Sequence, residues 1–413
     1  MYKFDKFNKY DLRWTMSLFG TAVGAGILFL PIKAGVGGIW PVFIMAILAF
    51  PMTFLSHRAL ARFCNASAKK QSDITDVCEE YFGFKWGYII TFLYFFAFFP
   101  ACIMYGVGIT NTVMSFMTYQ LGFGEINRFL VCFVVITLMM FVMIFNEDLV
   151  IKVCEWLVYP LCALLLMFSL YLIPHWKFEV FSYVPSITDF GITIWFALPV
   201  LAFAFEHTPA ISTFALSMQR HYGDSHKDYK CNQILFYNAG LLLFFVMFFV
   251  ISCVMSLDRN DFLLAAQQNI PIVSYFANKL NEPVISYFGP IIAILAIATS
   301  FFGHYFGARE GLNGLVHKTC VKFGKKEPNE KKIAKITAIS FYIVMFVLSY
   351  LNPSILGIID TLAGPVIAAV LFLLPMIGIY NVPALKKYRS KFADLFIVLF
   401  GSATVLTVLF KIF

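Results

Sequence analysis

The sequence predicts an all-helical protein that crosses a membrane many times and folds as an inverted repeat. Three observations lead to this fold class. Of the 413 residues, 60% are hydrophobic and only 13% are charged, whereas soluble proteins carry about 25% charged residues. The chain contains eleven apolar runs of the length that a helix needs to cross a bilayer, about 20 residues. The first and the sixth of these runs are interrupted at matching places.

The eleven predicted spans follow one another with little chain between most of them. We expect a single membrane transport domain over 1–413, with one repeat at about 12–173, a second at about 190–380 and an extra helix at about 392–412. The turn Asn146-Glu147-Asp148 alone separates the fourth span from the fifth. The spans are expected at about 12–33, 38–61, 86–117, 129–146, 149–173, 190–218, 232–257, 284–316, 333–351, 354–380 and 392–412.

Basic residues in the connections indicate how the chain is oriented. With the N-terminus in the cytoplasm, the inner connections hold 24 of the 31 Lys and Arg residues and the outer ones hold six. Because cytoplasmic loops are enriched in Lys and Arg, we expect the N-terminus inside and the C-terminus outside. The net charge of +8 is therefore attributed to orientation and not to nucleic acid binding. No cleavable signal peptide is visible, and the nine cysteines are expected to be reduced and structural.

The first span contains GTAVGAGILFLP at 20–31, where an uninterrupted helix would be expected. Glycine weakens a helix by about 1 kcal/mol, and Gly20, Gly24 and Gly26 lie close together. One interpretation is a close helix-packing face, because Gly20-x-x-x-Gly24 fits the small-xxx-small pattern. The other is a broken helix that offers backbone groups to a ligand, since freed backbone in a membrane must face protein or a water-filled cavity.

The sixth span has a corresponding interruption. It reads FALPVLAFAFEHTPAISTF, with Glu206 to Pro209 in its middle. The two long connections, 62–85 and 258–283, are also five spans apart and are expected on opposite faces. Matching defects in two halves are typical of inverted-repeat transporters, in which discontinuous helices form the binding site. The pairing favours a binding-site interpretation of 20–31.

Ionisable residues inside an apolar span are a functional-site hypothesis by default, and Glu206 and His207 are in this position. The alternative is that the span ends at Phe205 and Glu206 reaches the headgroups. Apolar sequence after Pro209 argues against this. Helix N-termini suit a carboxylate and freed carbonyls suit an ammonium or a metal cation. The hydroxyls of Thr21 and Thr208 complete a site that fits a small zwitterion such as an α-amino acid.

Several long motifs resemble the hydroxy/aromatic amino acid permease family of the amino acid/polyamine transporter superfamily. The likeness extends over nearly the whole chain and is strongest to bacterial serine transporters, with threonine/serine symporters next. It implies a leucine-transporter-type fold of eleven spans in the bacterial inner membrane and proton-driven import of L-serine, with threonine or other small neutral amino acids as alternatives. The motifs are GTAVGAGILFLPIKAGVGGIWP, AILAFPMTFLSHRALARF, FAFEHTPAISTFA, GHYFGAREGLNG and NPSILGIIDTLAGPVIA.

Two residues depart from the pattern of that family. Thr299 replaces a lysine and Glu206 replaces an asparagine. A buried site must compensate such a change in charge. One solution is a protonated Glu206 that acts as the proton carrier. The other is a sodium ion in place of the lost ammonium, held by Thr299 and Ser300 together with the carbonyls of Gly20 and Val23. Ligation by oxygen alone suits a hard cation.

We therefore expect no cofactor other than the coupling ion, H⁺ or Na⁺. The partners are expected to be L-serine or L-threonine and membrane lipid. An intramembrane enzyme is the alternative of another class, but no phosphate loop, HExxH pair or GxSxG elbow is found. Asp360 is expected as the N-terminal charge of a helix. The expected substrate-binding residues are Thr21, Ala22, Gly24, Ala25, Gly26, Tyr105, Phe205, Glu206, His207 and Thr208.

Overall fold

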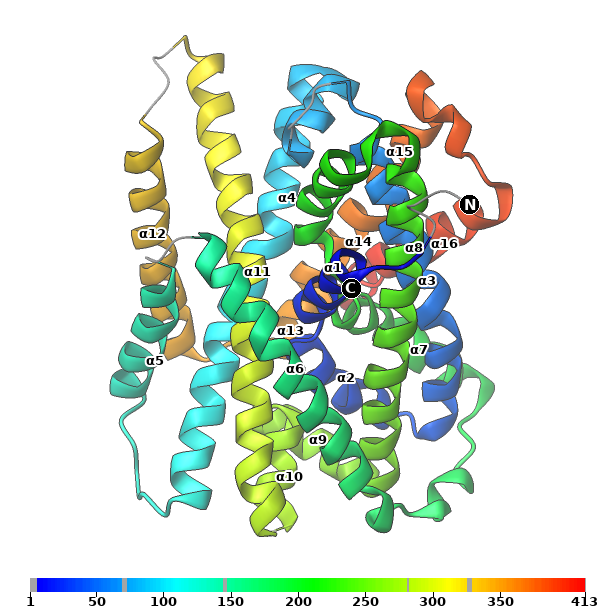
Figure 1. Ribbon diagram of the computed structural model, residues 1–413. Coiled ribbons are helices and arrows are strands. Elements are labelled where there is room, and N and C mark those ends of the chain that lie inside the picture. Colours follow the sequence, from blue (N-terminus) through cyan, green and yellow to red (C-terminus); the bar gives the residue numbers. More distant parts are fainter. Residues whose placement is uncertain (1–5, 69–72, 144–146, 281, 325–328, 413) are drawn as a thin grey trace.

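The structure, a computed structural model, is all-helical and describes residues 6–68, 73–143, 147–280, 282–324 and 329–412 (Figure 1). Each predicted span contains helix within the described residues. The turn predicted at Asn146 lies outside the described residues. The main helices are α1 Lys9–Ala22, α2 Ala25–Gly35, α3 Ile39–Asn65, α4 Ile74–Ser115, α5 Arg128–Val142, α6 Glu147–Tyr171, α7 Ile187–Ala204, α8 Ile211–Ser256, α11 Pro283–Lys322, α12 Glu330–Leu351 and α16 Lys391–Leu406.

The protein crosses the membrane several times. Within the described residues, seven helical stretches are long and apolar enough to span, and the bent pair α1 and α2 makes an eighth. One of the seven stretches, 187–256, is 70 residues long, far more than the roughly 20 that one crossing requires. It contains both the interruption at Phe205–Ala210 and a turn at Gly223, where φ is 69°. This stretch therefore consists of three separate helical rods.

The tenth predicted span, 354–380, has an irregular helical course. It comprises α13 Ile355–Ile358, η5 Ile359–Ala363, α14 Gly364–Ala368, η6 Ala369–Leu373 and α15 Leu374–Asn381. The segments η5 and η6 are π-helical, a geometry that usually occurs as single turns within α-helices. The short C-terminal elements are η7 Pro383–Tyr388 and α17 Leu409–Ile412.

The two long connections form helices at opposite ends of the molecule. The first nine residues of α4 are separated from its apolar part by Gly83, whose φ of 76° permits a sharp change of direction. The other connection forms α9 Arg259–Gln268 and α10 Ile272–Leu280. Figure 1 places α9 and α10 at the bottom and the start of α4, in light blue, at the top. The expected placement on opposite faces is thus reproduced.

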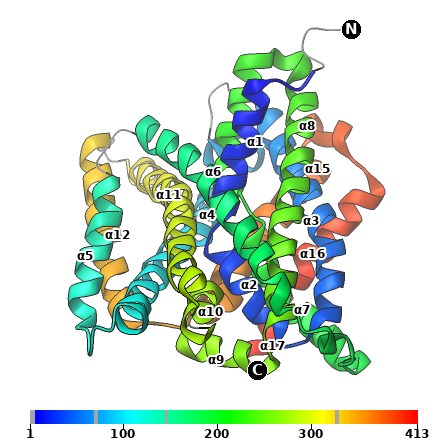
Figure 2. The same cartoon turned by 60° about the horizontal axis from the view of Figure 1, so that its bottom comes forward.

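Two groups of helices enclose the breaks. One group is α4, α5, α11 and α12, and the other is α1, α2, α3, α7 and α8, with contacts throughout each group. Figures 1 and 2 show the first group on the left and the second on the right. Helix α1 and α2 also contact α11. The two interrupted spans therefore lie where the groups meet.

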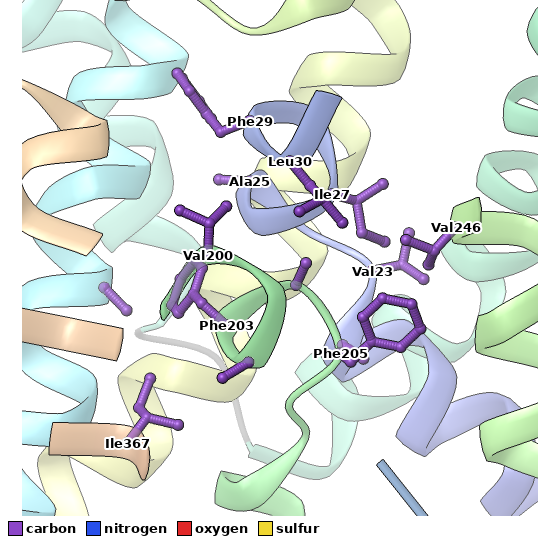
Figure 3. Close-up of a cluster of buried hydrophobic side chains, with 14 of the residues drawn as sticks. Val23, Ala25, Ile27, Phe29, Leu30, Val200, Phe203, Phe205, Val246 and Ile367 are labelled. Atoms are coloured by element: carbon purple, nitrogen blue, oxygen red, sulfur yellow. The ribbon is translucent and has the colours of Figure 1, made fainter. Parts of the chain in front are cut away.

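The glycines of the first span serve both interpretations that the sequence left open. A Cβ on Gly20 would lie 2.1 Å from Val158 Cγ2, and one on Gly26 would lie 2.8 Å from the Cα of Ala204. These two positions are close packing contacts. Between them the helix breaks, and α2 is bent by 55° from α1. Buried apolar residues, including Val23 and Phe205, surround the break (Figure 3).

The expectation for Asp360 is corrected. This residue does not begin a helix, because the helical course starts at Ile355 after Ser354, whose hydroxyl accepts the N–H of Gly357. Asp360 lies one turn further on, in η5, and its Oδ2 is 2.6 Å from the Nζ of Lys33 in α2. The hydroxyl cap ahead of it explains the shift in the helix start.

Candidate substrate and ion site

The first break exposes backbone groups of both helix ends within the protein interior. Helix α1 ends at Ala22, and the Val23 N–H donates to the Phe19 carbonyl at 2.9 Å. Val23 has φ −76° and ψ 90°, and Gly24 has φ −144° and ψ −150°. Helix α2 starts after Gly24, which provides no side-chain cap. A buried helix N-terminus of this kind presents N–H groups and partial positive charge to an anion.

The second break is held by side chains. Helix α7 ends at Ala204, and the 3₁₀ turn η4, Thr208–Ala210, leads into α8. The Thr208 N–H donates to Glu206 Oε2 at 2.9 Å, and the His207 N–H donates to Nε2 of His57 at 3.1 Å. Glu206, His207 and Thr208 are each 1% exposed. The hydroxyl of Thr208 is buried and has no hydrogen-bond partner among the described residues.

Glu206 is paired with His304 of α11. Glu206 Oε1 lies 2.5 Å from His304 Nε2, and the other ring nitrogen, Nδ1, lies 2.9 Å from the Ser300 carbonyl. Because a carbonyl oxygen only accepts, Nδ1 carries a proton. One further proton then lies between Nε2 and the carboxyl group, on either atom. The Tyr105 hydroxyl is 3.3 Å from His304 Nδ1, so Tyr105 belongs to the same cluster.

Ser300 joins α11 to the first break. Its hydroxyl donates to the Thr21 carbonyl at 3.2 Å, and a Cβ on Gly24 would lie 2.0 Å from the Ser300 Oγ. Only a glycine fits this approach. This hydrogen bond brings two oxygens, one from α11 and one from the end of α1, together in the interior. The Thr299 hydroxyl bonds within α11, to the carbonyls of Leu295 and Ala296.

The structure therefore brings most of the predicted residues to one buried centre. Thr21 and Gly24 meet Ser300, and Glu206 meets His304 beside Tyr105. The carbonyl that Ser300 contacts is that of Thr21, which lies between the predicted Gly20 and Val23. The side of Gly20 that lacks a side chain faces α6. Ala22, Ala25 and Phe205 are buried around the breaks.

Three polar residues at the centre were not selected from the sequence. His304 lies four residues after Ser300 and therefore on the same helix face, and this spacing is the signal that could have identified it. His57 and Asn238 lie in α3 and α8 and both bond to His207. Their apolar surroundings in the sequence gave no signal that distinguishes them from structural residues.

A cavity of about 790 Å³ lies on one side of the second break. It is lined by polar residues of α4 and α11 and reaches Pro209, which directly follows the break. Its walls carry both signs of charge, with Asp73, Glu79, Arg309 and Lys318 among them. The cavity also reaches Val321 near the end of α11 and Lys331 at the start of α12.

A family model, the tryptophan/tyrosine permease family, matches residues 12–413. The chain belongs to this permease family. Among its relatives, the serine transporter SdaC of Escherichia coli K12 is 46% identical over 412 residues, covering 98% of this chain and 95% of SdaC. The threonine/serine transporter TdcC of Edwardsiella tarda is 40% identical over 434 residues, covering 99% and 97%.

Solved structures share the fold of this permease at low sequence identity. A mutant of the Eremococcus coleocola manganese transporter is 13% identical with a TM-score of 0.69, and the match covers 100% of this chain and 88% of that one. A Na⁺-coupled sialic acid symporter in its substrate-bound, outward-open state is 14% identical with a TM-score of 0.52, covering 96% and 88%. These likenesses concern the fold alone.

Proposed function

We propose that this permease is a secondary active symporter that imports L-serine across the bacterial inner membrane. The observation that carries the proposal is that both helix breaks contact α11 in the buried interior, the first through Ser300 and the second through His304. Identity of 46% to a serine transporter and 40% to a threonine/serine transporter supports the substrate. Threonine/serine transport, or transport of other small neutral amino acids, is the alternative.

The substrate's charged groups match the two breaks. The carboxylate would bind the N–H groups at the start of α2, near Ala25 and Gly26, because a helix N-terminus stabilises an anion. The ammonium would bind carbonyls at the ends of α1 and α7, where the helical ladders stop. The unpartnered Thr208 hydroxyl would bond the serine hydroxyl. Such a bond discriminates strongly against alanine, whereas an apolar pocket would not.

Sodium is the coupling ion that the arrangement supports best. The Ser300 hydroxyl and the Thr21 carbonyl already meet, and a sodium ion would take them as ligands with the carbonyls of Gly20 and Val23 and the Thr299 hydroxyl, which are close to them in sequence. All of these donors are oxygen, which hard cations prefer. Thr299 would need to turn its hydroxyl away from its own helix to take part.

Proton coupling through Glu206 is the alternative, and a specific contact favours it. Glu206 and His304 share one proton in a fully buried pair, with side-chain exposures of 0% and 2%. Loading and unloading this pair would carry a proton across, provided that each state of transport opens it to one side only. Uptake driven by a pH gradient in the absence of sodium would be its signature.

The topology completes the proposal. Eleven spans in a 5+5 inverted repeat, with the N-terminus in the cytoplasm and the C-terminus outside, would place the 790 Å³ cavity on the cytoplasmic side. The cavity would then be a path for substrate release. The variants Ser67→Cys and Tyr119→Cys, each labelled at the introduced cysteine from inside and from outside in oriented vesicles, test this orientation. We expect labelling from inside in Ser67→Cys and from outside in Tyr119→Cys.

The decisive experiment is uptake of radiolabelled L-serine by proteoliposomes with imposed gradients. An inward sodium gradient at equal pH on both sides is expected to drive accumulation. Membranes that bind serine but turn over no substrate would dispose of the alternative of an intramembrane enzyme. Absence of serine transport under any gradient would reject the proposed function.

A further inference from the structure

A second buried polar cluster lies beside the second break and takes no part in the substrate or ion contacts described above. It consists of His57 in α3, His207 in the break and Asn238 in α8. The two imidazole rings are stacked, with centroids 3.6 Å apart and planes 6° from parallel. His57 and His207 are 1% exposed and Asn238 is 0% exposed.

The hydrogen bonds of His57 define its form. The His207 backbone N–H donates to His57 Nε2 at 3.1 Å, so that nitrogen carries a lone pair. Nδ1 lies 2.8 Å from the Thr53 carbonyl and therefore carries the proton. His57 is thus a neutral imidazole, oriented by its own helix, whose free nitrogen faces the break. The Asn238 amide lies 3.2 Å from His207 Nε2 and orients the second ring.

We infer that His57 is a positioning residue of the transport site, which holds the unwound chain at His207 by accepting its backbone N–H. A buried N–H without a partner is strongly disfavoured. In place of the α-helical bond that the break has removed, the His207 N–H has a partner from a different helix. Without the His57 acceptor, the His207 N–H would find a partner through rewinding of α7 or through a shift of the chain.

The position of His207 determines the positions of both of its neighbours. Glu206 on one side bonds to His304, and Thr208 on the other side bears the unpartnered hydroxyl. A change at His207 therefore moves two groups of the proposed site, although the hydrogen bonds of His57 itself join Thr53, Ser56 and the His207 N–H. The part of the test that measures the KM for L-serine rests on the proposed function, whereas the part that measures amide hydrogen exchange does not.

The test compares two substitutions that differ in the acceptor. In His57→Gln, the side-chain oxygen can take the place of Nε2, and its NH₂ can bond the Ser56 hydroxyl. In His57→Leu, no acceptor is present. The matched control is Ser56→Ala, which removes a buried neighbour 3.3 Å from His57 Nδ1 but leaves the bond to His207.

Two quantities are measured on the full chain in detergent or proteoliposomes. Amide hydrogen exchange of a peptide covering 205–210 is expected to be at least tenfold faster in His57→Leu, and within about threefold of wild type in His57→Gln and Ser56→Ala. The KM for L-serine is expected to rise at least tenfold in His57→Leu only. If His57→Leu is not recovered folded, His57→Asn replaces it, since the shorter amide does not reach the break.

The inference would be overturned if His57→Leu and His57→Gln gave the same exchange rate at 205–210 and the same KM, whether both resembled wild type or both were impaired. Unchanged exchange at 205–210 in the variant that lacks the acceptor would also overturn it. Because exchange is measured without substrate, a wild-type protein that fails to transport serine would reject the proposed function and leave the positioning role open to this test.

Discussion

Glu206 and His304 lie 98 residues apart in the predicted second repeat, and their side chains meet with 2.5 Å between Oε1 and Nε2. The Ser300 carbonyl keeps the second nitrogen of His304 protonated, so the pair contains one exchangeable proton between its two partners. The pair connects the break of the sixth span with α11, which also contacts the first break through Ser300. The Ser300 and His304 side chains of α11 thereby link this helix to both breaks.

The first prediction is an asymmetry between the two partners of this pair. Glu206→Gln keeps a donor for Nε2 and is expected to cost only about 1 kcal/mol of stability. His304→Leu leaves Oε1 of the buried Glu206 carboxyl without its partner and is expected to cost about 3 kcal/mol or more. Thermal unfolding in detergent measures both. Equal destabilisation by the two substitutions would contradict the shared-proton geometry.

The second prediction concerns the approach of Ser300 to Gly24. Gly24→Ala is expected to abolish serine uptake and to cost about 1–3 kcal/mol by overpacking, because the new Cβ would lie 2.0 Å from Ser300 Oγ. Combining it with Ser300→Gly should recover most of the stability. The control is Gly240→Ala in α8, where no atom lies within 4 Å of the added Cβ. That variant should be as stable as wild type or more so.

How far the site could be predicted differs from one part to another. The two breaks were found because glycines, or Glu-His-Thr-Pro, interrupt apolar runs five spans apart, and this signal is local in sequence. The pairing of Glu206 with His304 could not be found, because it depends on how α7 and α11 pack across 98 residues of chain. The role of His57 could not be found either, because its partner is a backbone N–H, which any residue except proline would provide at position 207.

Helix ends were predicted to within a few residues wherever hydrophobicity changes abruptly. Asp360 was misplaced because an acidic residue near a helix start is a common signal, while the actual start is set by the Ser354 hydroxyl. Its partner Lys33 belongs to α2, and charge alone does not reveal a contact between residues 327 positions apart.

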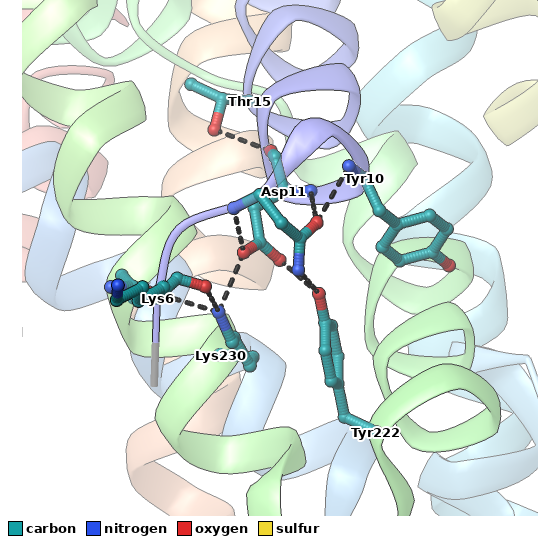
Figure 4. A network of polar contacts seen from close by, with 8 residues as sticks. Lys6, Tyr10, Asp11, Thr15, Tyr222 and Lys230 are labelled. Carbon is teal, nitrogen blue, oxygen red and sulfur yellow. Dashed lines mark hydrogen bonds and ion pairs between the residues drawn. The ribbon is translucent and has the colours of Figure 1, made fainter. Parts of the chain in front are cut away.

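The third prediction concerns a buried ion pair at the end of the molecule where the chain begins. Asp11 Oδ2 lies 2.7 Å from Lys230 Nζ, both side chains are fully buried, and Tyr222 donates to the other carboxylate oxygen at 2.6 Å (Figure 4). Lys230→Met leaves the carboxylate uncompensated and is expected to cost about 3–5 kcal/mol. The double variant with Asp11→Asn should be more stable than Lys230→Met alone.

The control for that prediction is an exposed pair. Lys177 and Asp258 lie 2.8 Å apart, with side-chain exposures of 41% and 65%. Surface pairs contribute at most about 1 kcal/mol, so Lys177→Met should have little effect on thermal unfolding. A loss as large as that of Lys230→Met would show that burial does not govern the energetics of the Asp11 pair.

The fourth prediction is a pH dependence in the α9–α10 connection, outside the predicted spans. Burial acts to raise the pKa of Asp261, but hydrogen bonds from Lys279, Tyr275 and the Asp258 N–H outweigh it and hold the pKa below its ordinary value of 3.8. The folded-state pKa is depressed, so this contribution to stability is present above about pH 3.8 and is lost as the pH falls through the folded value. Asp261→Asn should therefore be less stable than wild type at pH 6.

The measurement is a series of thermal unfolding curves between pH 6 and pH 3. The difference between wild type and Asp261→Asn is expected to shrink as the pH falls. A constant difference over this range would mean that the Asp261 carboxylate does not stabilise the connection through its charge.

The central claim is that the two helix breaks form one sodium-coupled serine site, and coupled uptake into proteoliposomes tests it most directly. With equal pH on both sides, an inward sodium gradient should drive serine accumulation in wild type. Thr299→Lys, which restores a positive charge at the ion position, should abolish the dependence on sodium. Accumulation that follows a pH gradient, ignores sodium and disappears in Glu206→Gln would contradict the sodium site and assign coupling to the Glu206–His304 pair.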